Sequence, residues 1–158
     1  MRLYFAYGSN MSVQQMKRRC PAARPLGIAH LDGWRFIINM RGTASIVPHP
    51  GGRVEGVLWR CTSECVATLD VFEGVGKKRY RKLHVPVAGR TDGRPVLTYA
   101  GMARGEGRPI RAYLEGTILP AATHWGLSDA YRSELARWLE PNTLGPLKPH
   151  PRRRGWRP

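Results

Sequence analysis

The chain has 158 residues, a length at which one domain with its own hydrophobic core is feasible. Apolar residues make up 42% and charged residues 23% of the chain, which are values of a globular protein and not of a disordered or fibrous one. No apolar run approaches the ~20 residues that a membrane-spanning helix needs. We therefore expect one globular domain and no membrane partner.

A strong positive charge is the unusual feature of the composition. Lys and Arg total 26 against 11 Asp and Glu, which gives a net charge of +15. Such a charge attracts nucleic acid, anionic lipid or anionic substrates, unless it is spread over solvated faces. Residues 145–158 hold five basic residues and four prolines. We therefore expect a globular domain over residues 1–141 and a basic Pro/Arg-rich tail over 142–158, disordered or loosely packed.

The cysteines and histidines favour a reducing compartment without a metal site. Cys20, Cys61 and Cys65 form neither an even disulfide set nor a paired C-x-x-C metal motif. The five histidines are dispersed, and no two have the i, i+4 spacing of ligands on one helix. We expect a cytoplasmic protein that binds no metal.

The first elements are a strand and a helix. Residues 3–7 are predicted to form a strand that ends at Gly8. Ser12 and Gln15 have the spacing of a capping box, which predicts a helix that stops before Pro21. Four short strands are expected next, over residues 26–31, 34–40, 44–48 and 53–61. Between them lie three dipeptides typical of hairpin turns, namely Asp32-Gly33, Arg41-Gly42 and Gly51-Gly52.

The second half of the chain mixes helices and strands. Ser63 is expected to cap a short helix, and residues 80–87 and 95–101 have the pattern of strands. Pro109 suits the first turn of a further helix, and Ser128 suits the cap of the last one. Short strands with few helices and no regular βαβ alternation predict an α+β fold with a curled, mainly antiparallel sheet.

The junction between the first strand and the first helix is a candidate binding loop. It has the sequence Tyr7-Gly8-Ser9-Asn10. Gly8 allows a ligand to approach the backbone closely, and the following amide N–H groups lie at the positive end of a helix dipole. Such a turn can hold a carboxylate or a developing oxyanion. The alternative is a plain turn in which Asn10 or Ser12 caps the helix.

Glu73 is a candidate general base. It lies at the C-terminal end of a predicted helix, between Phe72 and Gly74. The helix dipole and the partly apolar setting disfavour its charge, which raises the pKa of a carboxyl group towards neutrality. The alternatives are a solvated Glu beside a capping glycine, or a pair of carboxylates with Asp70 that serves as an acid/base or metal site.

Taken in order, the motifs resemble one family from about residue 3 to residue 140. The motifs are Phe5-Ala6-Tyr7-Gly8-Ser9-Asn10-Met11, Arg19-Cys20-Pro21, Gly33-Trp34-Arg35-Phe36, Gly56-Val57-Leu58-Trp59 and Leu69-Asp70-Val71-Phe72-Glu73-Gly74-Val75, followed by Tyr80. Together they are similar to the γ-glutamylcyclotransferase and AIG2-like family. The resemblance implies a small mixed domain around a closed or nearly closed, mainly antiparallel β-barrel with a cavity and a few flanking helices.

The resemblance also implies a set of site residues. The family's catalytic acid/base falls on Glu73. Its substrate-binding residues fall on Tyr7, Gly8, Ser9 and Asn10 of the loop and on Tyr80, Tyr99 and Tyr113. The strong positive charge and the basic tail are departures from the family pattern.

The implied reaction converts a γ-glutamyl amino acid or amine to 5-oxoproline and a free amine. One carboxylate of raised pKa can take a proton from the attacking amine and return one to the leaving amine, so no metal or organic cofactor is needed. Removal of a γ-glutamyl protecting group would use the same chemistry. The rival hypothesis is a non-catalytic protein whose basic surface binds nucleic acid or an acidic partner.

Overall fold

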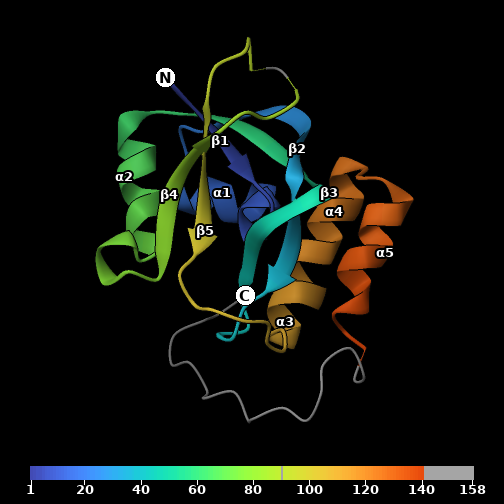
Figure 1. Cartoon of the computed structure of the whole chain (residues 1–158). Coiled ribbons are helices and arrows are strands. Elements are labelled where there is room, and N and C mark those ends of the chain that lie inside the picture. Colours follow the sequence, from blue (N-terminus) through green and yellow to red (C-terminus); the bar gives the residue numbers. More distant parts are fainter. Residues whose placement is uncertain (90, 141–158) are drawn as a thin grey trace.

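A computed structural model describes residues 1–89 and 91–140 of the chain. Its centre is one five-stranded sheet with the strand order β2-β3-β1-β5-β4 (Figure 1). The strands are β1 (Arg2–Ala6), β2 (Arg24–Ile38), β3 (Ala44–Cys61), β4 (Tyr80–Val85) and β5 (Val96–Gly101). All neighbouring strands are antiparallel except β1 and β5, which are parallel. The predicted α+β class with a mainly antiparallel sheet is confirmed.

Helices flank the sheet, with α2 at the left of Figure 1 and α4 and α5 at the right. The helical segments are η1 (Ser9–Met11), α1 (Val13–Arg19), α2 (Ser63–Phe72), η2 (Val75–Lys77), α3 (Arg111–Tyr113), η3 (Leu114–Ile118), α4 (Leu119–Trp125) and α5 (Asp129–Arg137). Ser12 and Ser128 cap α1 and α5 as predicted. The cap of α2 is Thr62 rather than Ser63, because the Thr62 hydroxyl accepts the Cys65 N–H at 3.1 Å.

The four short strands expected between residues 26 and 61 are in fact two long ones. Of the three dipeptides expected to form turns, only Arg41-Gly42 lies in the turn that joins β2 to β3. Asp32-Gly33 lies inside β2, and Gly51-Gly52 lies inside β3. The strand register shifts between Asp32 and Trp34, where Gly33 has φ of 83°. A Cβ at Gly52 would lie 2.6 Å from the Trp34 carbonyl oxygen. These glycines therefore permit a bulge and a close strand approach without ending the strands.

The described residues do not support the expected closed or nearly closed barrel, because their sheet is open and has β2 and β4 as its two edges. One isolated bridge joins β2 to the segment that follows β4, in which His30 and Ala88 exchange backbone hydrogen bonds of 3.0 and 2.9 Å. β4 ends at Val85 and is followed by Pro86, which has no N–H to donate. Pro86 therefore separates the end of β4 from the bridged residue Ala88.

The buried core holds the end of β1 in place. Phe5 and Leu58, which face each other on β1 and β3, are 0% and 1% exposed. Beyond β1, the Trp125 indole N–H donates to the Met11 carbonyl at 2.8 Å and ties α4 to η1. The segment 7–11 is thus fixed between the sheet and the C-terminal helices.

Two further expectations from the sequence concern the basic tail and a membrane-spanning helix. The basic tail predicted over residues 142–158 lies outside the described residues. Within residues 1–89 and 91–140, no helix has both the length and the apolar character required to cross a membrane.

Candidate active site

One cavity, with a volume of about 120 Å³, collects every site residue that the sequence predicted. These are Tyr7, Gly8, Ser9, Asn10, Glu73, Tyr80, Tyr99 and Tyr113. Six further residues line it that were not predicted as site residues, namely Tyr4, Arg19, Thr43, Ala44, Phe72 and Arg79. The lining comes from β1, η1, α1, α2, β3, β4, β5, the helical run that begins at α3 and the loops between them, so the cavity exists only in the folded chain.

The loop after β1 differs from the predicted strand-to-helix junction. The short helix η1 lies between β1 and α1, and Ser12 rather than Asn10 caps α1. Ser9 and Asn10 are buried, 9% and 3% exposed, and their side chains form hydrogen bonds within the protein. The loop therefore contributes side chains as well as backbone to the wall of the cavity.

Gly8 allows the loop to pack against the opposite wall. A Cβ placed at Gly8 would lie 3.2 Å from the Ala44 Cβ and 3.2 Å from the Tyr113 hydroxyl oxygen. Tyr113 is itself held there, because its hydroxyl accepts the Ala44 backbone N–H at 3.2 Å. A larger residue at position 8 would have to displace one of these two groups.

Asn10 connects the loop to Glu73. Its amide Nδ2 donates to Glu73 Oε1 at 3.2 Å and to the Tyr4 hydroxyl at 3.0 Å. Its Oδ1 accepts from Gln15 Nε2 at 3.0 Å and from an Arg19 guanidinium nitrogen at 2.9 Å. Because two donors occupy Oδ1, the amide cannot turn over without losing them, and Nδ2 stays directed at Glu73.

Glu73 has the electrostatic setting of a carboxyl group poised near neutral pH. It is the C-cap of α2, where the helix dipole is negative, and its backbone N–H donates to the Leu69 carbonyl at 2.8 Å. Burial raises the pKa of Glu73 to about 7, against the lowering effects of Arg19 and of the Asn10 hydrogen bond. Near neutral pH this group can both accept and donate a proton.

The tyrosines form walls whose hydroxyls are mostly engaged with the protein. Tyr7 donates to the Tyr99 backbone carbonyl, and Tyr80 donates to the Ala44 carbonyl at 2.6 Å. Burial raises the pKa of all four predicted tyrosines, including that of Tyr113 to about 12, so they stay neutral at physiological pH. They therefore shape the cavity and supply neutral hydroxyl groups.

Asp70 does not form a carboxylate pair with Glu73. Its Oδ1 accepts the Tyr99 hydroxyl at 2.7 Å, and its Oδ2 forms an ion pair with Lys82 at 2.9 Å. Among the described residues there is also no group of three or more His, Cys, Asp or Glu that could hold a metal ion. Asp70 instead supports the wall that Tyr99 forms.

Arg19 is the clearest residue that the sequence analysis passed over. Besides its bond to Asn10, its guanidinium carbon lies 4.3 Å from the centre of the Phe72 ring, a cation–π geometry. The Arg19-Cys20-Pro21 motif contributes to the family resemblance, but it implied no role for Arg19 in the site. It brings a positive charge to the cavity from α1.

Known proteins are similar to this chain in sequence and in fold. The family model described as "Gamma-glutamyl cyclotransferase, AIG2-like" matches residues 4–117. Gamma-glutamylcyclotransferases of Mus musculus and Homo sapiens are each 29% identical over 150 residues, with 89% of this chain and 79% of the relative covered. A solved structure named gamma-glutamyl cyclotransferase superposes with a TM-score of 0.79 at 28% identity and covers 93% of both chains. The chain thus belongs to the γ-glutamyl cyclotransferase, AIG2-like family.

Proposed function

We propose that this protein is a γ-glutamyl cyclotransferase that converts a γ-glutamyl amino acid or amine to 5-oxoproline and a free amine. The observation that carries the proposal is Glu73, a largely buried carboxyl group with a pKa of about 7 in the wall of a cavity. Family membership supports the same reaction type.

Glu73 would act first as a base and then as an acid. The α-ammonium group of the substrate loses a proton to the Glu73 carboxylate, and the resulting amine attacks the γ-carbonyl carbon. The new C–N bond closes the five-membered ring. As the old amide C–N bond breaks, the Glu73 carboxyl group returns this proton to the leaving nitrogen. The regenerated carboxylate then takes the second proton from the ring nitrogen and passes it to the departing amine, which leaves as an ammonium ion. Glu73 ends in its starting state.

The rest of the cavity would fold the substrate for attack on itself. Intramolecular attack requires mainly the correct rotamer, which a narrow polar cavity with fixed walls favours. Asn10 keeps the Glu73 carboxyl group in place. Gly8 and the backbone that follows it offer the closest approach for the substrate's carboxylate or for the oxyanion that develops on the carbonyl.

A substrate panel tests the proposal. The protein is incubated with γ-glutamyl amino acids and γ-glutamyl amines, and 5-oxoproline is measured. We expect release from part of the panel and a loss of ~10²-fold or more in Glu73→Gln, the range expected for a general base. Glu64→Gln changes an exposed carboxylate on the same helix and serves as the matched control. Near-native turnover in a folded Glu73→Gln variant would contradict the assignment.

Removal of a γ-glutamyl protecting group from a biosynthetic amine would proceed by the same steps. It differs only in the amine that leaves. The panel therefore includes γ-glutamyl derivatives of simple amines, and a preference for them over γ-glutamyl amino acids would favour this form of the activity.

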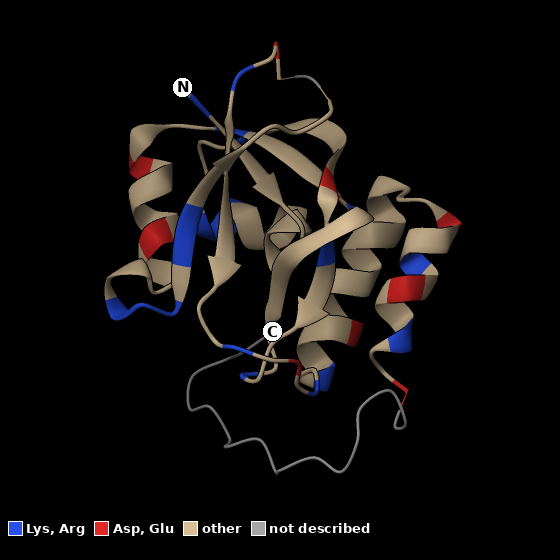
Figure 2. Ribbon diagram, in the orientation of Figure 1, with Lys and Arg blue, Asp and Glu red and all other residues tan. Residues whose placement is uncertain are grey.

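The net charge of +15 favours nucleic-acid binding as a second candidate function. Figure 2 shows Lys and Arg on several separate elements, including α1, β4, the loop after α2 and α5. A salt-steep affinity for an oligonucleotide would support this candidate, because each phosphate contact adds about 0.9 to the slope of log K against log salt. We favour the enzyme, since the basic residues of the described chain are dispersed.

A further inference from the structure

The cavity carries more positive than negative charge. Glu73 is the only acidic residue among its described lining residues, whereas Arg19 and Arg79 both line it. Arg19 is already engaged with Asn10 and lies over the ring of Phe72. Arg79 is therefore the cation left to meet a ligand.

The backbone places Arg79 firmly at the cavity. Its N–H donates to the Gly74 carbonyl at 3.1 Å, and its carbonyl accepts the Met102 N–H at 2.8 Å. Gly74 also leaves room for its side chain, since a Cβ there would lie 2.9 Å from Arg79 Cδ and 3.3 Å from its Cγ. The arginine stem thus crosses the turn that directly follows Glu73.

The guanidinium group of Arg79 has no acidic partner within residues 1–89 and 91–140. The described ion pairs involve other cations, such as Lys82, which is held by Asp70 at 2.9 Å on the neighbouring part of β4. Arg79 is exposed, so its charge lies at the mouth of the cavity and not in its depth. A planar guanidinium group in such a place suits a carboxylate, which it can bind through two hydrogen bonds.

We propose that Arg79 binds the carboxylate of the leaving group and thereby selects γ-glutamyl α-amino acids over γ-glutamyl derivatives of amines without a carboxylate. The inference rests on the proposed cyclotransferase function. All such substrates share the γ-glutamyl half, which must lie beside Glu73 for the ring to close. The part that varies extends from the γ-carbonyl towards the mouth, where Arg79 lies.

Two matched substrates isolate this contact. γ-Glutamylalanine and γ-glutamylethylamide have the same γ-glutamyl half. Their leaving groups, alanine and ethylamine, differ only in that alanine carries a carboxylate. The quantity to measure is the ratio of their kcat/KM values for 5-oxoproline release. It is compared among the native protein, Arg79→Gln, Arg79→Lys and Lys77→Gln. Lys77 is an exposed cation of the same loop that does not line the cavity, so its variant is the charge control.

We expect the native protein to prefer γ-glutamylalanine and Arg79→Gln to lower that preference about tenfold, as loss of one charge-assisted contact at a partly exposed site implies. Arg79→Lys should retain part of the preference, Lys77→Gln nearly all of it, and added salt should reduce it in the native protein. An unchanged ratio in Arg79→Gln overturns the inference. So does an equal loss with both substrates, which would mean that Arg79 binds the γ-glutamyl carboxylate instead.

These outcomes are separate from failure of the proposed function. If the native protein released 5-oxoproline from neither these two compounds nor the wider panel, the cyclotransferase proposal itself would be wrong. If it consumed both substrates without a preference that depends on Arg79, only the inference about the leaving group would be wrong.

Discussion

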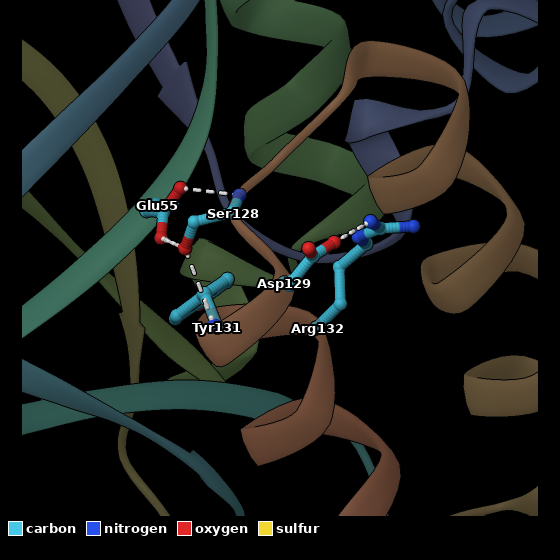
Figure 3. Close-up of polar contacts among 5 residues, drawn as sticks. All are labelled: Glu55, Ser128, Asp129, Tyr131 and Arg132. Carbon is cyan, nitrogen blue, oxygen red and sulfur yellow. Dashed lines mark hydrogen bonds and ion pairs between the residues drawn. The ribbon is translucent and has the colours of Figure 1, made fainter.

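Two glutamates lie at opposite ends of helices and have opposite settings. Glu55, on β3, lies at the N-terminus of α5, where its carboxylate accepts the Ser128 N–H at 3.0 Å and the Ser128 hydroxyl (Figure 3). Ser128 in turn accepts the Tyr131 N–H at 3.3 Å. The two donors of Ser128 hold the Glu55 carboxylate at the positive end of the helix dipole. Glu55 thus joins the sheet to α5.

Glu73 lies at the negative end of α2 and is largely buried, with Asn10 as its side-chain hydrogen-bond donor. Burial raises the pKa of this carboxyl group to about 7. The comparison shows that burial, together with the helix end and the hydrogen-bond donors, decides what one residue type does. The Glu55 carboxylate stabilises the fold. At Glu73 the charged form is unfavourable, so the carboxyl group can exchange a proton near neutral pH.

The largest effect we expect comes from closing the cavity beside Glu73. Gly8→Val places a branched side chain where a Cβ alone would lie 3.2 Å from both the Ala44 Cβ and the Tyr113 hydroxyl. It should lower kcat/KM by ~10²-fold, because a small misplacement of reacting groups has effects of this size. Gly76→Ala, a glycine with no atoms near its missing Cβ, is the control. A folded Gly8→Val variant with native kinetics would show that the loop does not shape the site.

A stability measurement on Glu73→Gln checks the cost of the buried charge. Folding raises the pKa of Glu73 from about 4.5 to about 7, so the folded state binds more protons in this window and the native chain loses stability as pH rises through it. Gln does not titrate. The variant should therefore be more stable by up to about 3 kcal/mol above pH 7 and gain little near pH 4. Thermal unfolding at both pH values measures this, and a variant destabilised equally at both would contradict it.

Removing the donor to Glu73 should change the pH profile. In Asn10→Ala the charged form of Glu73 loses its hydrogen bond, so the pKa of Glu73 rises further and the rise of kcat/KM with pH moves to higher pH. Activity at pH 7 should fall about tenfold. Asn10→Ala also removes the oxygen that accepts the Arg19 hydrogen bond. Arg19→Lys is therefore measured beside it. If the pH profile of kcat/KM for Asn10→Ala kept the native inflection point, Asn10 would have no influence on the ionisation of Glu73.

The smallest effect concerns the other glutamate. Glu55→Gln should lower the free energy of unfolding by about 1 kcal/mol, because it weakens a charged contact at a helix N-terminus, and should leave 5-oxoproline release unchanged. In a double-mutant cycle of Glu55→Gln and Ser128→Ala, the losses of unfolding free energy should be non-additive, since the two residues share one contact. Additive losses would mean that Glu55 and Ser128 stabilise the protein independently.

The sequence could predict the site better than the sheet. Glu73, Tyr7 and Tyr80 belong to the motifs that carry the family resemblance, and the resemblance also implied Tyr99 and Tyr113. All of these residues line the cavity. The predicted strand ends near Gly33 and Gly52 were wrong, because a glycine in such a dipeptide is typical of a turn and of a bulge alike. Only the neighbouring strand decides between the two, as the close approach of Gly52 to Trp34 shows. The position of Arg79 over Gly74 was not predictable, because it depends on backbone hydrogen bonds to Gly74 and to Met102, which is distant in the sequence.

The most direct test of the central claim is a carboxyl NMR titration of Glu73 in the folded native protein. Its signal is assigned by its absence in Glu73→Gln, and 5-oxoproline release is followed over the same pH range. We predict a midpoint of about 7 for Glu73 and a rise of kcat/KM with the same midpoint. A Glu73 midpoint near 4.5, with activity that follows another group, would contradict the claim that this buried carboxyl group is the acid/base of the site.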